Sequence, residues 1–386
     1  MKGDFIGTID FKRQFSGIYQ DKTILITGHT GFKGSWLTYW LSLLGANVIG
    51  YSKDIPTDPN HFELLELNKI CTSYFADMTN FESLRKVIKE NEPDIIFHLA
   101  AQSLVRYSYA NPLETLNANI MGITHLLECC RQEAHTAAII NVTSDKCYEN
   151  RDESKAFTEE HPMGGFDPYS CSKGVSELIT SCYRNSFFQQ MKTNSGQPIL
   201  LASARAGNVI GGGDWAEDRL IPDVIRATSE EEAVLIRNPR ATRPWQHVLE
   251  PLSGYLLLGL RLLEGKKGFA EGWNFGPLNR ESLPVSEVLN IAKQTWDKIQ
   301  IEYQEDENQA HEAKFLRLDC SKANQILDWK PVWTTEQAIE KTITWYQDFY
   351  QNNNLKTQDN LLEFSNHAFR KGCLWALDTK SILKNN

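Results

Sequence analysis

The sequence predicts an α/β protein whose main domain is a doubly wound parallel sheet. Two observations support this prediction. Short apolar, β-rich segments alternate with helical segments along the first half of the chain, and a glycine-rich loop joins the first expected strand to the first expected helix. Strands that are separated by helices pair in parallel, and nearly continuous apolar strands indicate a sheet covered on both faces. A smaller, mixed α/β lobe is expected to follow this domain.

The expected elements alternate regularly up to residue 206. Six apolar segments are expected to be strands: 23–27, 47–51, 73–76, 94–100, 137–142 and 199–204. Apolar residues recur at helical spacing in the intervening segments 32–44, 81–90, 116–130 and 169–183. We therefore expect one nucleotide-binding type of domain over residues 21–206, preceded by a leader of residues 1–20.

Beyond residue 206 the pattern is less regular. Clusters of Gly, Pro and Trp separate isolated helices that are expected at 285–299 and 335–350. A strand-like segment at 272–276 is expected to return to the main sheet. Apart from that strand, residues 207–350 should form the smaller lobe, and residues 351–386 form a C-terminal tail that matches no chemical motif.

Composition excludes several classes of function. The formal net charge is -9, which argues against a general nucleic-acid surface. The first 22 residues lack the apolar segment of a secretory signal, and the richest apolar run, Gly254–Leu263, is too short to span a membrane. The eight cysteines show no CxxC or Cys/His spacing. We therefore expect a cytoplasmic protein with reduced thiols, no bound metal and no membrane partner.

A glycine-rich loop follows the first expected strand. Gly28 allows a tight turn, Gly31 lets the backbone approach a pyrophosphate, and Gly34 allows close packing of helix on sheet. The N-terminus of the following helix favours the phosphate charge. The strand–loop–helix context therefore predicts a Rossmann-type site for a nicotinamide dinucleotide. The loop residues expected to bind it are Gly28, His29, Thr30, Gly31, Phe32, Lys33 and Gly34.

The end of the second strand bears on the choice between NAD and NADP. A carboxylate that binds the ribose is expected there, and Asp54 is the only nearby acid. Lys53 would instead suit a 2′-phosphate, so the choice stays open, with NAD favoured. Asp77 follows the third strand, where such folds contact adenine, although it would equally cap the helix at 81–90.

Tyr169 and Lys173 form the expected redox pair. They lie one helical turn apart and therefore on one helix face. A lysine ammonium beside a phenol favours the phenolate, which takes a proton from an alcohol as hydride leaves the same carbon. Ser144 would hydrogen-bond the same hydroxyl. Asp145 and Lys146 add an acid and an amine that simple alcohol oxidation does not need, the alternative being a surface ion pair with a turn aspartate.

Six sequence blocks together resemble one enzyme family. They are TGHTGFKGSW (27–36), HLAAQ (98–102), VTSDKCYEN (142–150), DPYSCSK (167–173), RAGNVIGGGDW (205–215) and RPWQHV (243–248). Over about residues 20–350 the chain resembles the extended short-chain dehydrogenase/reductases, in the branch of nucleotide-sugar epimerases and dehydratases. It is most similar there to the CDP-glucose 4,6-dehydratases, because Lys146 stands where the dTDP-glucose and GDP-mannose dehydratases carry a glutamate.

The resemblance implies an NAD-dependent lyase that converts CDP-glucose to CDP-4-keto-6-deoxyglucose for deoxysugar and surface-polysaccharide biosynthesis. Tyr169 would remove the C4 hydroxyl proton with the help of Lys173 and Ser144. Lys146, if neutral, would remove the C5 proton. Asp145 would protonate the leaving C6 hydroxyl. A charged Lys146 would instead stabilise an enolate while another group takes the C5 proton. Another dehydratase or a 4-epimerase of the family, acting on dTDP-glucose, GDP-mannose or a UDP-sugar, is the alternative; a catalytically idle nucleotide sensor should have lost Tyr169 or Lys173.

The resemblance also implies further contacts and an assembly. Ala100 and Gln102 would lie near the nicotinamide. Planar arginine side chains suit a diphosphate, and the substrate-binding residues implied are Ser103, Arg106, Asn208, Arg219, Arg243 and His247. Loop contacts for Ser103 and Arg106, a surface ion pair for Arg219 and a structural role for His247 remain the alternatives. A homodimer or homotetramer is implied, built on the helices at 116–130 and 169–183.

Overall fold

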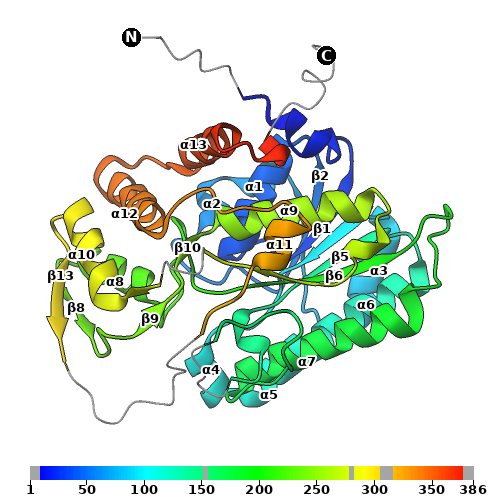
Figure 1. Ribbon diagram of the computed structural model, residues 1–386, viewed down its shortest axis with the longest axis horizontal. Coiled ribbons are helices and arrows are strands. Elements are labelled where there is room, and N and C mark those ends of the chain that lie inside the picture. The colour runs from blue at the N-terminus through cyan, green and yellow to red at the C-terminus, as the bar shows by residue number, and fades with distance from the viewer. Residues whose placement is uncertain (1–8, 151–154, 278–281, 305–315, 377–386) are drawn as a thin grey trace.

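The structure is a computed structural model and describes residues 9–150, 155–277, 282–304 and 316–376. Its centre is a seven-stranded sheet with the order β11-β6-β5-β4-β1-β2-β3 (Figure 1). All neighbouring strands in it run parallel. The strands are β1 (Thr23–Thr27), β2 (Asn47–Ser52), β3 (Thr72–Phe75), β4 (Ile95–His98), β5 (Ala138–Val142), β6 (Leu200–Ala206) and β11 (Gly272–Phe275). The predicted doubly wound sheet is therefore confirmed.

The strand order changes direction between β1 and β4. The chain builds β1, β2 and β3 outward to one edge, then returns so that β4 pairs with the other side of β1. In such sheets the carboxyl ends of the strands form a binding crevice at this point. The strand expected at 272–276 does return to the sheet, where β11 pairs with β6.

Helices cover both faces of the sheet (Figure 1). On one face lie α3 (Phe81–Asn91), α6 (Gly122–Glu133) and α7 (Pro168–Tyr183), whose apolar residues form one core with β1, β4, β5 and β6. On the other face lie α1 (Phe32–Leu43) and α9 (Leu249–Leu263). Both faces of the strands are thus buried, which explains their continuous apolar sequences.

Helix α9 lies within residues 207–350 but packs on the sheet rather than in the smaller lobe. Two glycines allow this close approach. A Cβ at Gly254 would stand 2.4 Å from the Phe275 ring, and one at Gly259 would stand 3.0 Å from Ile95. The chain therefore leaves the smaller lobe after residue 248 and returns to the main domain for α9 and β11.

The smaller lobe is built mainly from α8 (Leu220–Ser229), α10 (Val285–Thr295) and the parallel pair β8 (Ala233–Ile236) and β13 (Gln300–Tyr303). The helix expected at 285–299 ends at Thr295, because Trp296 adopts an extended backbone conformation. The short pairs β7 (Val209–Ile210) with β10 (Gln246–His247) and β9 (Thr242–Arg243) with β12 (Leu283–Pro284) connect this lobe to the main domain.

The remaining elements connect these layers. The helix expected at 116–130 is interrupted, because a π turn at Asn117–Met121 joins α5 to α6. No helix in the described ranges combines the length and the apolar character that a membrane span requires. The other helices are α2 (His61–Leu64), α4 (Val105–Ala110), α5 (Pro112–Leu116), α11 (Ser321–Gln325), α12 (Thr335–Asn352) and α13 (Thr357–Arg370), and the other short turns are Phe11–Gly17, Leu67–Lys69, Asp145–Cys147, Arg184–Phe188, Lys267–Phe269 and Leu374–Ala376.

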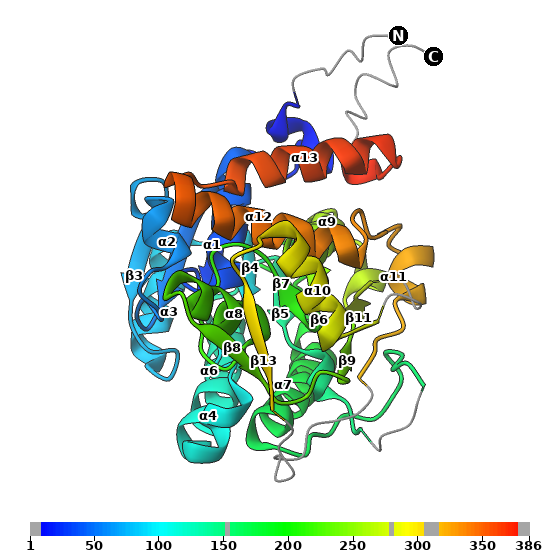
Figure 2. The same ribbon diagram turned by 90° about the vertical axis from the view of Figure 1, so that its left-hand side faces the viewer.

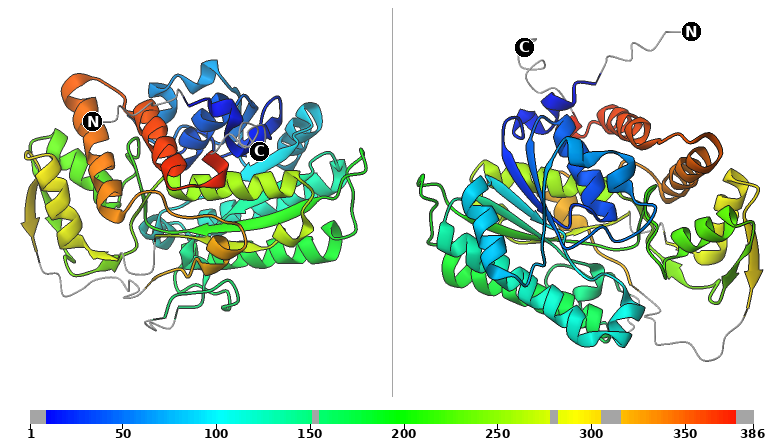
Figure 3. Two further views of the ribbon diagram at one scale, coloured as in Figure 1. Left: turned by 45° about the horizontal axis from the view of Figure 1, so that its top comes forward. Right: turned by 180° about the vertical axis from the view of Figure 1, so that it is seen from behind.

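The leader and the tail pack against each other on α1. Figure 2 shows α13 on the outside of α12, and Figure 3 places the N-terminal turn and the end of α13 on the same side of the molecule. Phe15 stacks on Trp375 with ring centroids 5.1 Å apart, and both rings lie against Trp40 of α1. All three side chains are buried. The two segments that sequence analysis set aside as leader and tail therefore contribute to the core.

We predict that Trp375→Ala lowers the free energy of unfolding by about 3–5 kcal/mol, because it leaves a cavity against Phe15 and Trp40. Urea unfolding followed by circular dichroism measures this. The neighbouring Leu374 is half exposed, so Leu374→Ala should have little effect. Equal losses in the two variants would show that the tail does not support the core through Trp375.

Candidate active site

The glycine-rich loop lies between β1 and α1 at the carboxyl edge of the sheet. Gly28 has φ +77°, and a Cβ there would stand 2.7 Å from the Ala100 amide nitrogen. A Cβ at Gly34 would stand 2.0 Å from the Gly28 carbonyl oxygen. Gly31 begins α1 without any side-chain cap, so the first amide groups of the helix remain available to an anion. The loop therefore fits a pyrophosphate.

The side chain of His29 anchors this loop to the sheet. Its ring is buried over Gly50 of β2, where a Cβ would stand 2.1 Å from the ring. Its two nitrogens are 2.8 Å from Ser52 Oγ and 2.9 Å from Ser73 Oγ. Burial lowers the pKa of His29 to about 4, so the ring is neutral near pH 7. The side chain of His29 thus stabilises the conformation of the loop.

At the end of β2, a main-chain contact holds the loop. Thr30 Oγ1 donates a hydrogen bond to the Asp54 carbonyl oxygen at 2.7 Å, while the Asp54 side chain is exposed. Lys53 lies 3.9 Å from the carboxylate of Asp77 and 3.5 Å from that of Glu114. Because both carboxylates pair with Lys53, its positive charge is not free to bind a 2′-phosphate.

Asp77 does not cap α3, so this alternative reading of Asp77 was wrong. Its carboxylate accepts hydrogen bonds from the amide and the hydroxyl of Thr79. Asn80 caps the helix instead and accepts from the Ser83 amide. Asp77 therefore stays beside the end of β3, where the sequence predicts contact with adenine.

Tyr169 and Lys173 lie in the first two turns of α7. Asp167 caps this helix by accepting from the Ser170 amide, which places Tyr169 beside the end of β5. Both side chains are 7% exposed. Burial raises the pKa of Tyr169 to about 12, which a hydrogen bond with Ser144 opposes. Burial lowers the pKa of Lys173 to about 8, so an ammonium and a phenol are held together in a largely dry site.

Ser144 and Asp145 form a hydrogen-bonded pair directly after β5. Ser144 Oγ donates to Asp145 Oδ1 at 2.9 Å. Asp145 is 2% exposed, and its Oδ2 has no hydrogen-bond partner among the described residues. A Cβ on Gly207 would stand 1.8 Å from that oxygen, so only glycine leaves room for the carboxylate. Lys146 follows in the same turn and is less buried.

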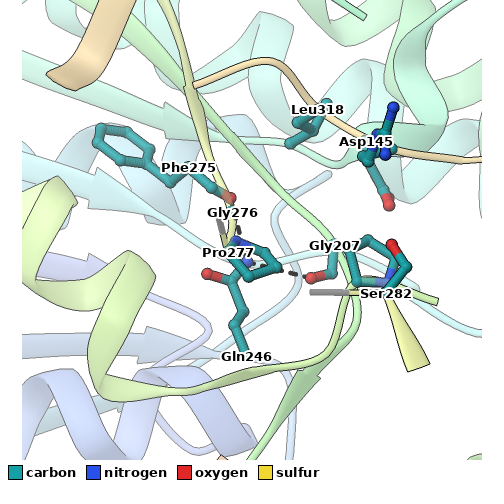
Figure 4. A pocket seen from close by; sticks show the side chains of 10 residues that line it. Asp145, Gly207, Gln246, Phe275, Gly276, Pro277, Ser282 and Leu318 are labelled. Atoms are coloured by element: carbon teal, nitrogen blue, oxygen red, sulfur yellow. Dashed lines mark hydrogen bonds between the residues drawn. The ribbon is translucent and has the colours of Figure 1, made fainter. Parts of the chain in front are cut away.

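A cavity opens beside Asp145 between the main domain and the smaller lobe (Figure 4). The side-chain nitrogen of Gln246, Nε2, donates to the carbonyl oxygens of Gly207 and Phe275, both at 3.1 Å, and so fixes one wall. The lining residues are Asp145, Gly207, Pro244, Gln246, Phe275, Gly276, Pro277, Ser282, Arg317 and Leu318. In this structure the cavity has room for about one water molecule. Burying a carboxylate oxygen without a hydrogen bond costs free energy, so a polar partner in the cavity would stabilise Asp145.

Two arginines predicted to bind substrate link the main domain to the smaller lobe. Arg219, at the start of α8, donates to Asp214 at 2.8 Å and to Ser103 Oγ at 2.9 Å. Arg106 forms an exposed ion pair with Asp218 at 2.8 Å. The structure thus brings Ser103 and Arg219 together, and gives both arginines a carboxylate partner.

Lys33 belongs electrostatically to the same site as Arg219. Its pKa is lowered to about 8 by burial and by the positive charges of Arg219 and Lys173. Lys33 of the glycine-rich loop, Lys173 of α7 and Arg219 of the smaller lobe therefore lie within electrostatic reach of one another.

The last three predicted substrate residues lie near the cavity wall. Asn208 adopts φ +49°, and its carbonyl oxygen accepts from the Gln246 amide. Arg243 is buried on β9, directly before the lining residue Pro244. His247 is fully buried, and its ring centroid is 4.8 Å from that of Trp333.

The environment of His247 favours the structural alternative. Its ring also meets Trp36 edge-on, and Nδ1 accepts from the Leu249 amide. Burial lowers the pKa of His247 to about 3, so the ring is neutral.

Comparison with known proteins places these features in a family. The model for GDP-mannose 4,6 dehydratase matches residues 25–342. The chain belongs to this family. It is 48% identical over 329 residues to CDP-glucose 4,6-dehydratase of Salmonella typhimurium, covering 85% of this chain and 91% of the relative. It is 26% identical to dTDP-glucose 4,6-dehydratase 1 of Escherichia coli, covering 84% and 92%.

Solved structures show the same fold. An epimerase from Methanothermobacter thermautotrophicus has a TM-score of 0.73 at 25% identity, covering 89% of this chain and 96% of that one. The dTDP-glucose 4,6-dehydratase of Bacillus anthracis, solved in complex with NAD, has a TM-score of 0.70 at 23% identity, covering 85% and 97%. The family resemblance predicted from the sequence blocks is confirmed.

Sequence reasoning missed two kinds of residue in this dehydratase fold. Gln246 and Arg317 line the cavity. Gln246 stands inside a quoted block, but Arg317 lies in no recognisable motif. Asn119, in the π turn, accepts from the Gln102 amide and donates to the Gln102 carbonyl and to Ser172 Oγ. It thereby joins the loop after β4 to α7. A π turn at a functional site is common, but nothing in the sequence announces it.

The structure also bears on metal binding. Among the residues it describes, no group of three or more His, Cys, Asp or Glu side chains could hold a metal ion.

We predict that Gly34→Ala destabilises the protein by about 1–3 kcal/mol, because the new methyl group meets the Gly28 carbonyl and forces α1 away from the loop. Thermal unfolding measures the change. Gly268→Ala is the matched control, since a Cβ there meets nothing within 4 Å. If both variants melt together with the unchanged chain, the close approach of loop and helix is wrong.

Proposed function

We propose that this chain catalyses the NAD-dependent 4,6-dehydration of CDP-glucose to CDP-4-keto-6-deoxyglucose. The observation that carries the proposal is the position of Asp145 at the cavity wall. Its buried carboxylate is hydrogen-bonded to Ser144 through one oxygen, and the other oxygen has no partner among the described residues. An alcohol dehydrogenase or a 4-epimerase needs no such group beside Ser144, whereas loss of water needs an acid. The similarity to the Salmonella enzyme supports CDP-glucose as the substrate.

The loop from Gly28 to Gly34 would hold the pyrophosphate of NAD, with Asp77 near adenine and Ala100 and Gln102 near the nicotinamide. When bound, NAD supplies an acceptor for the hydride from C4 and returns a hydride to C6. The carboxylates beside Lys53 favour NAD over NADP, because they oppose a further negative charge at the ribose.

Tyr169 takes the proton of the C4 hydroxyl in the first step. Burial holds its pKa at about 12, so a phenolate near pH 7 needs stabilisation by positive charge. Lys173 supplies that charge one turn along α7, and Arg219 adds to it from the smaller lobe. The Ser144 hydroxyl holds the substrate oxygen beside Tyr169. The products of this step are a C4 carbonyl and a protonated tyrosine.

Lys146 and Asp145 perform the elimination. The C4 carbonyl acidifies the C5 proton, which a neutral Lys146 removes, while Asp145 in its acid form gives a proton to the C6 hydroxyl as it leaves as water. In the alternative, another group removes the C5 proton, and Lys146 stays charged and stabilises the resulting enolate. Asn208 and Arg243 are next in sequence to the cavity-lining residues Gly207 and Pro244, and Arg219 contacts Ser103. Together with Arg106, these residues would bind the sugar nucleotide.

A comparison of substrates tests the function. The purified chain is incubated with NAD and, separately, with CDP-glucose, dTDP-glucose, UDP-glucose and GDP-mannose, and the 4-keto sugar is detected by its absorbance in alkali. We expect a keto sugar from CDP-glucose at a much higher rate than from the others. A 4-epimer without a keto product, or preference for another base, would overturn the assignment.

The proposal includes self-association into a homodimer or homotetramer. Large apolar side chains are exposed on the outer helices, among them Leu113 of α5 at 83% and Leu178 of α7 at 58%. Such residues on neighbouring helices suit a contact with a second copy of the chain. Light scattering coupled to size-exclusion chromatography measures the mass in solution.

We predict that Lys146→Ala reduces formation of the keto product by about 10²–10⁴-fold, the usual contribution of a positioned acid or base. Oxidation at C4 should continue in part, because Tyr169, Lys173 and Ser144 are unchanged. Single-turnover absorbance at the wavelength of the reduced nicotinamide separates the two steps. Lys89→Ala, on the exposed side of α3, is the control; full dehydration by the Lys146 variant would remove this residue from the mechanism.

A further inference from the structure

Helix α7 carries a third ionisable side chain in line with the redox pair. Tyr169, Lys173 and Glu177 are spaced by four residues and therefore lie on one helix face. All three are buried, and Glu177 is 4% exposed. The proposed chemistry uses the first two and leaves Glu177 without a role.

The Glu177 carboxylate is held by donors from two strands. One oxygen accepts from the hydroxyl of Thr143, and the other accepts from Ser203 Oγ at 2.7 Å and from the Arg205 guanidinium at 2.8 Å. Thr143 directly precedes Ser144, so the same strand end positions both Glu177 and the residue beside Tyr169. Burial alone would raise the pKa of Glu177, but Arg205 and these hydrogen bonds hold it below its usual value.

The side chain of Arg205, on β6, is itself held by hydrogen bonds. Its second nitrogen donates to the Tyr148 hydroxyl at 2.6 Å, and that hydroxyl donates to Asn274 Oδ1 on β11 at 2.7 Å. The guanidinium also lies over the Tyr148 ring. The ion pair of Glu177 and Arg205 is therefore buried, and both carboxylate oxygens and both terminal guanidinium nitrogens are hydrogen-bonded, while Arg205 Nε has no partner among the described residues. Hydrogen bonds of this kind let a buried pair keep both charges.

Lys173 faces groups from four elements. Lys33 on α1 is cationic, His98 on β4 is neutral because burial lowers its pKa to about 3, and the buried Cys147 thiol is neutral because burial raises its pKa. On α7 itself lie the phenol of Tyr169 and the carboxylate of Glu177. Burial lowers the pKa of Lys173 to about 8, and Glu177 is the charge that opposes this most strongly.

We propose that Glu177 is a positioning residue that keeps Lys173 protonated, and that Arg205 sets the strength of this effect by sharing the carboxylate. The charge of Lys173 then depends on a pair of residues that touches no substrate. The meaning of this coupling for catalysis rests on the proposed function, since Lys173⁺ supports the Tyr169 phenolate. The coupling itself belongs to the ligand-free chain and is measurable there.

The test is a titration of the Lys173 ammonium in the ligand-free protein by ¹⁵N NMR, with Lys173→Met to assign the signal. Glu177→Gln should move the midpoint about one to three pH units lower, because an opposite charge nearby has been removed. Arg205→Gln should move it higher, since the carboxylate then acts on Lys173 without competition. Glu177→Asp, which keeps the charge, should stay close to the unchanged protein.

The same shifts should appear in turnover of CDP-glucose. Activity falls where Lys173 loses its proton, so the alkaline limb of the pH profile should move to lower pH in Glu177→Gln and to higher pH in Arg205→Gln. A merely structural role would lower activity at every pH in both variants and leave the limb in place.

Shifts in the same direction, or no shift in the NMR titration, would overturn the proposal. If Glu177→Gln does not fold, Arg205→Gln decides together with a ¹³C NMR titration of the Glu177 carboxylate, because burial raises the pKa of Glu177 once Arg205 is gone. A Lys173 midpoint that stays or falls while Glu177 is ionised contradicts the coupling. Opposite NMR shifts in a chain that does not convert CDP-glucose would leave the coupling intact and overturn the proposed function instead.

Discussion

The removal of ionisable groups from water at the carboxyl ends of β5 and β6 is the constraint on which the whole site depends. A buried charge is stable only when other charges and hydrogen bonds replace its hydration. Glu177 meets this condition through Thr143, Ser203 and Arg205. Tyr169 and Lys173 meet it only in part, which moves the pKa of the tyrosine upward and that of the lysine downward. The hydrogen bonds and the ion pair of Glu177 thus stabilise its ionised form, whereas the pKa values of Tyr169 and Lys173 remain shifted by burial.

Main-chain geometry enforces this arrangement as strongly as charge does. Gly207 leaves the space in which the Asp145 carboxylate lies, and Gly28 and Gly34 let the loop, the sheet and α1 approach within contact distance. Each position tolerates no Cβ, so the site tolerates substitution poorly at residues that carry no functional group. The smaller lobe then closes the crevice through Arg219, which reaches both Asp214 and Ser103.

The sequence predicted those parts of the molecule that local patterns determine. Every strand expected up to residue 206 is present, and the helix with Tyr169 and Lys173 begins one residue from its expected start. These elements could be predicted because the spacing of apolar residues within one short segment shows whether the segment is a buried strand or a helix. The packing of α9 on the sheet, the stacking of Phe15 on Trp375 and the enclosure of His247 by Trp36 and Trp333 depend on partners far away in sequence. For the same reason, the sequence placed Asp145 near the site but did not show which residues hold Glu177, since these partners come from β6 and from the residue after β5.

The contact between Phe15 and Trp375 has a consequence for folding during translation. The aromatic cluster on α1 cannot close until Trp375 has been translated and has left the ribosome, because that residue supplies one of the three rings. Until then, the surface of Trp40 that Trp375 covers in the folded protein stays exposed, even if the sheet has already formed. During that interval this apolar surface is open to chaperones or to other nascent chains. The turn Leu374–Ala376 then covers this apolar surface.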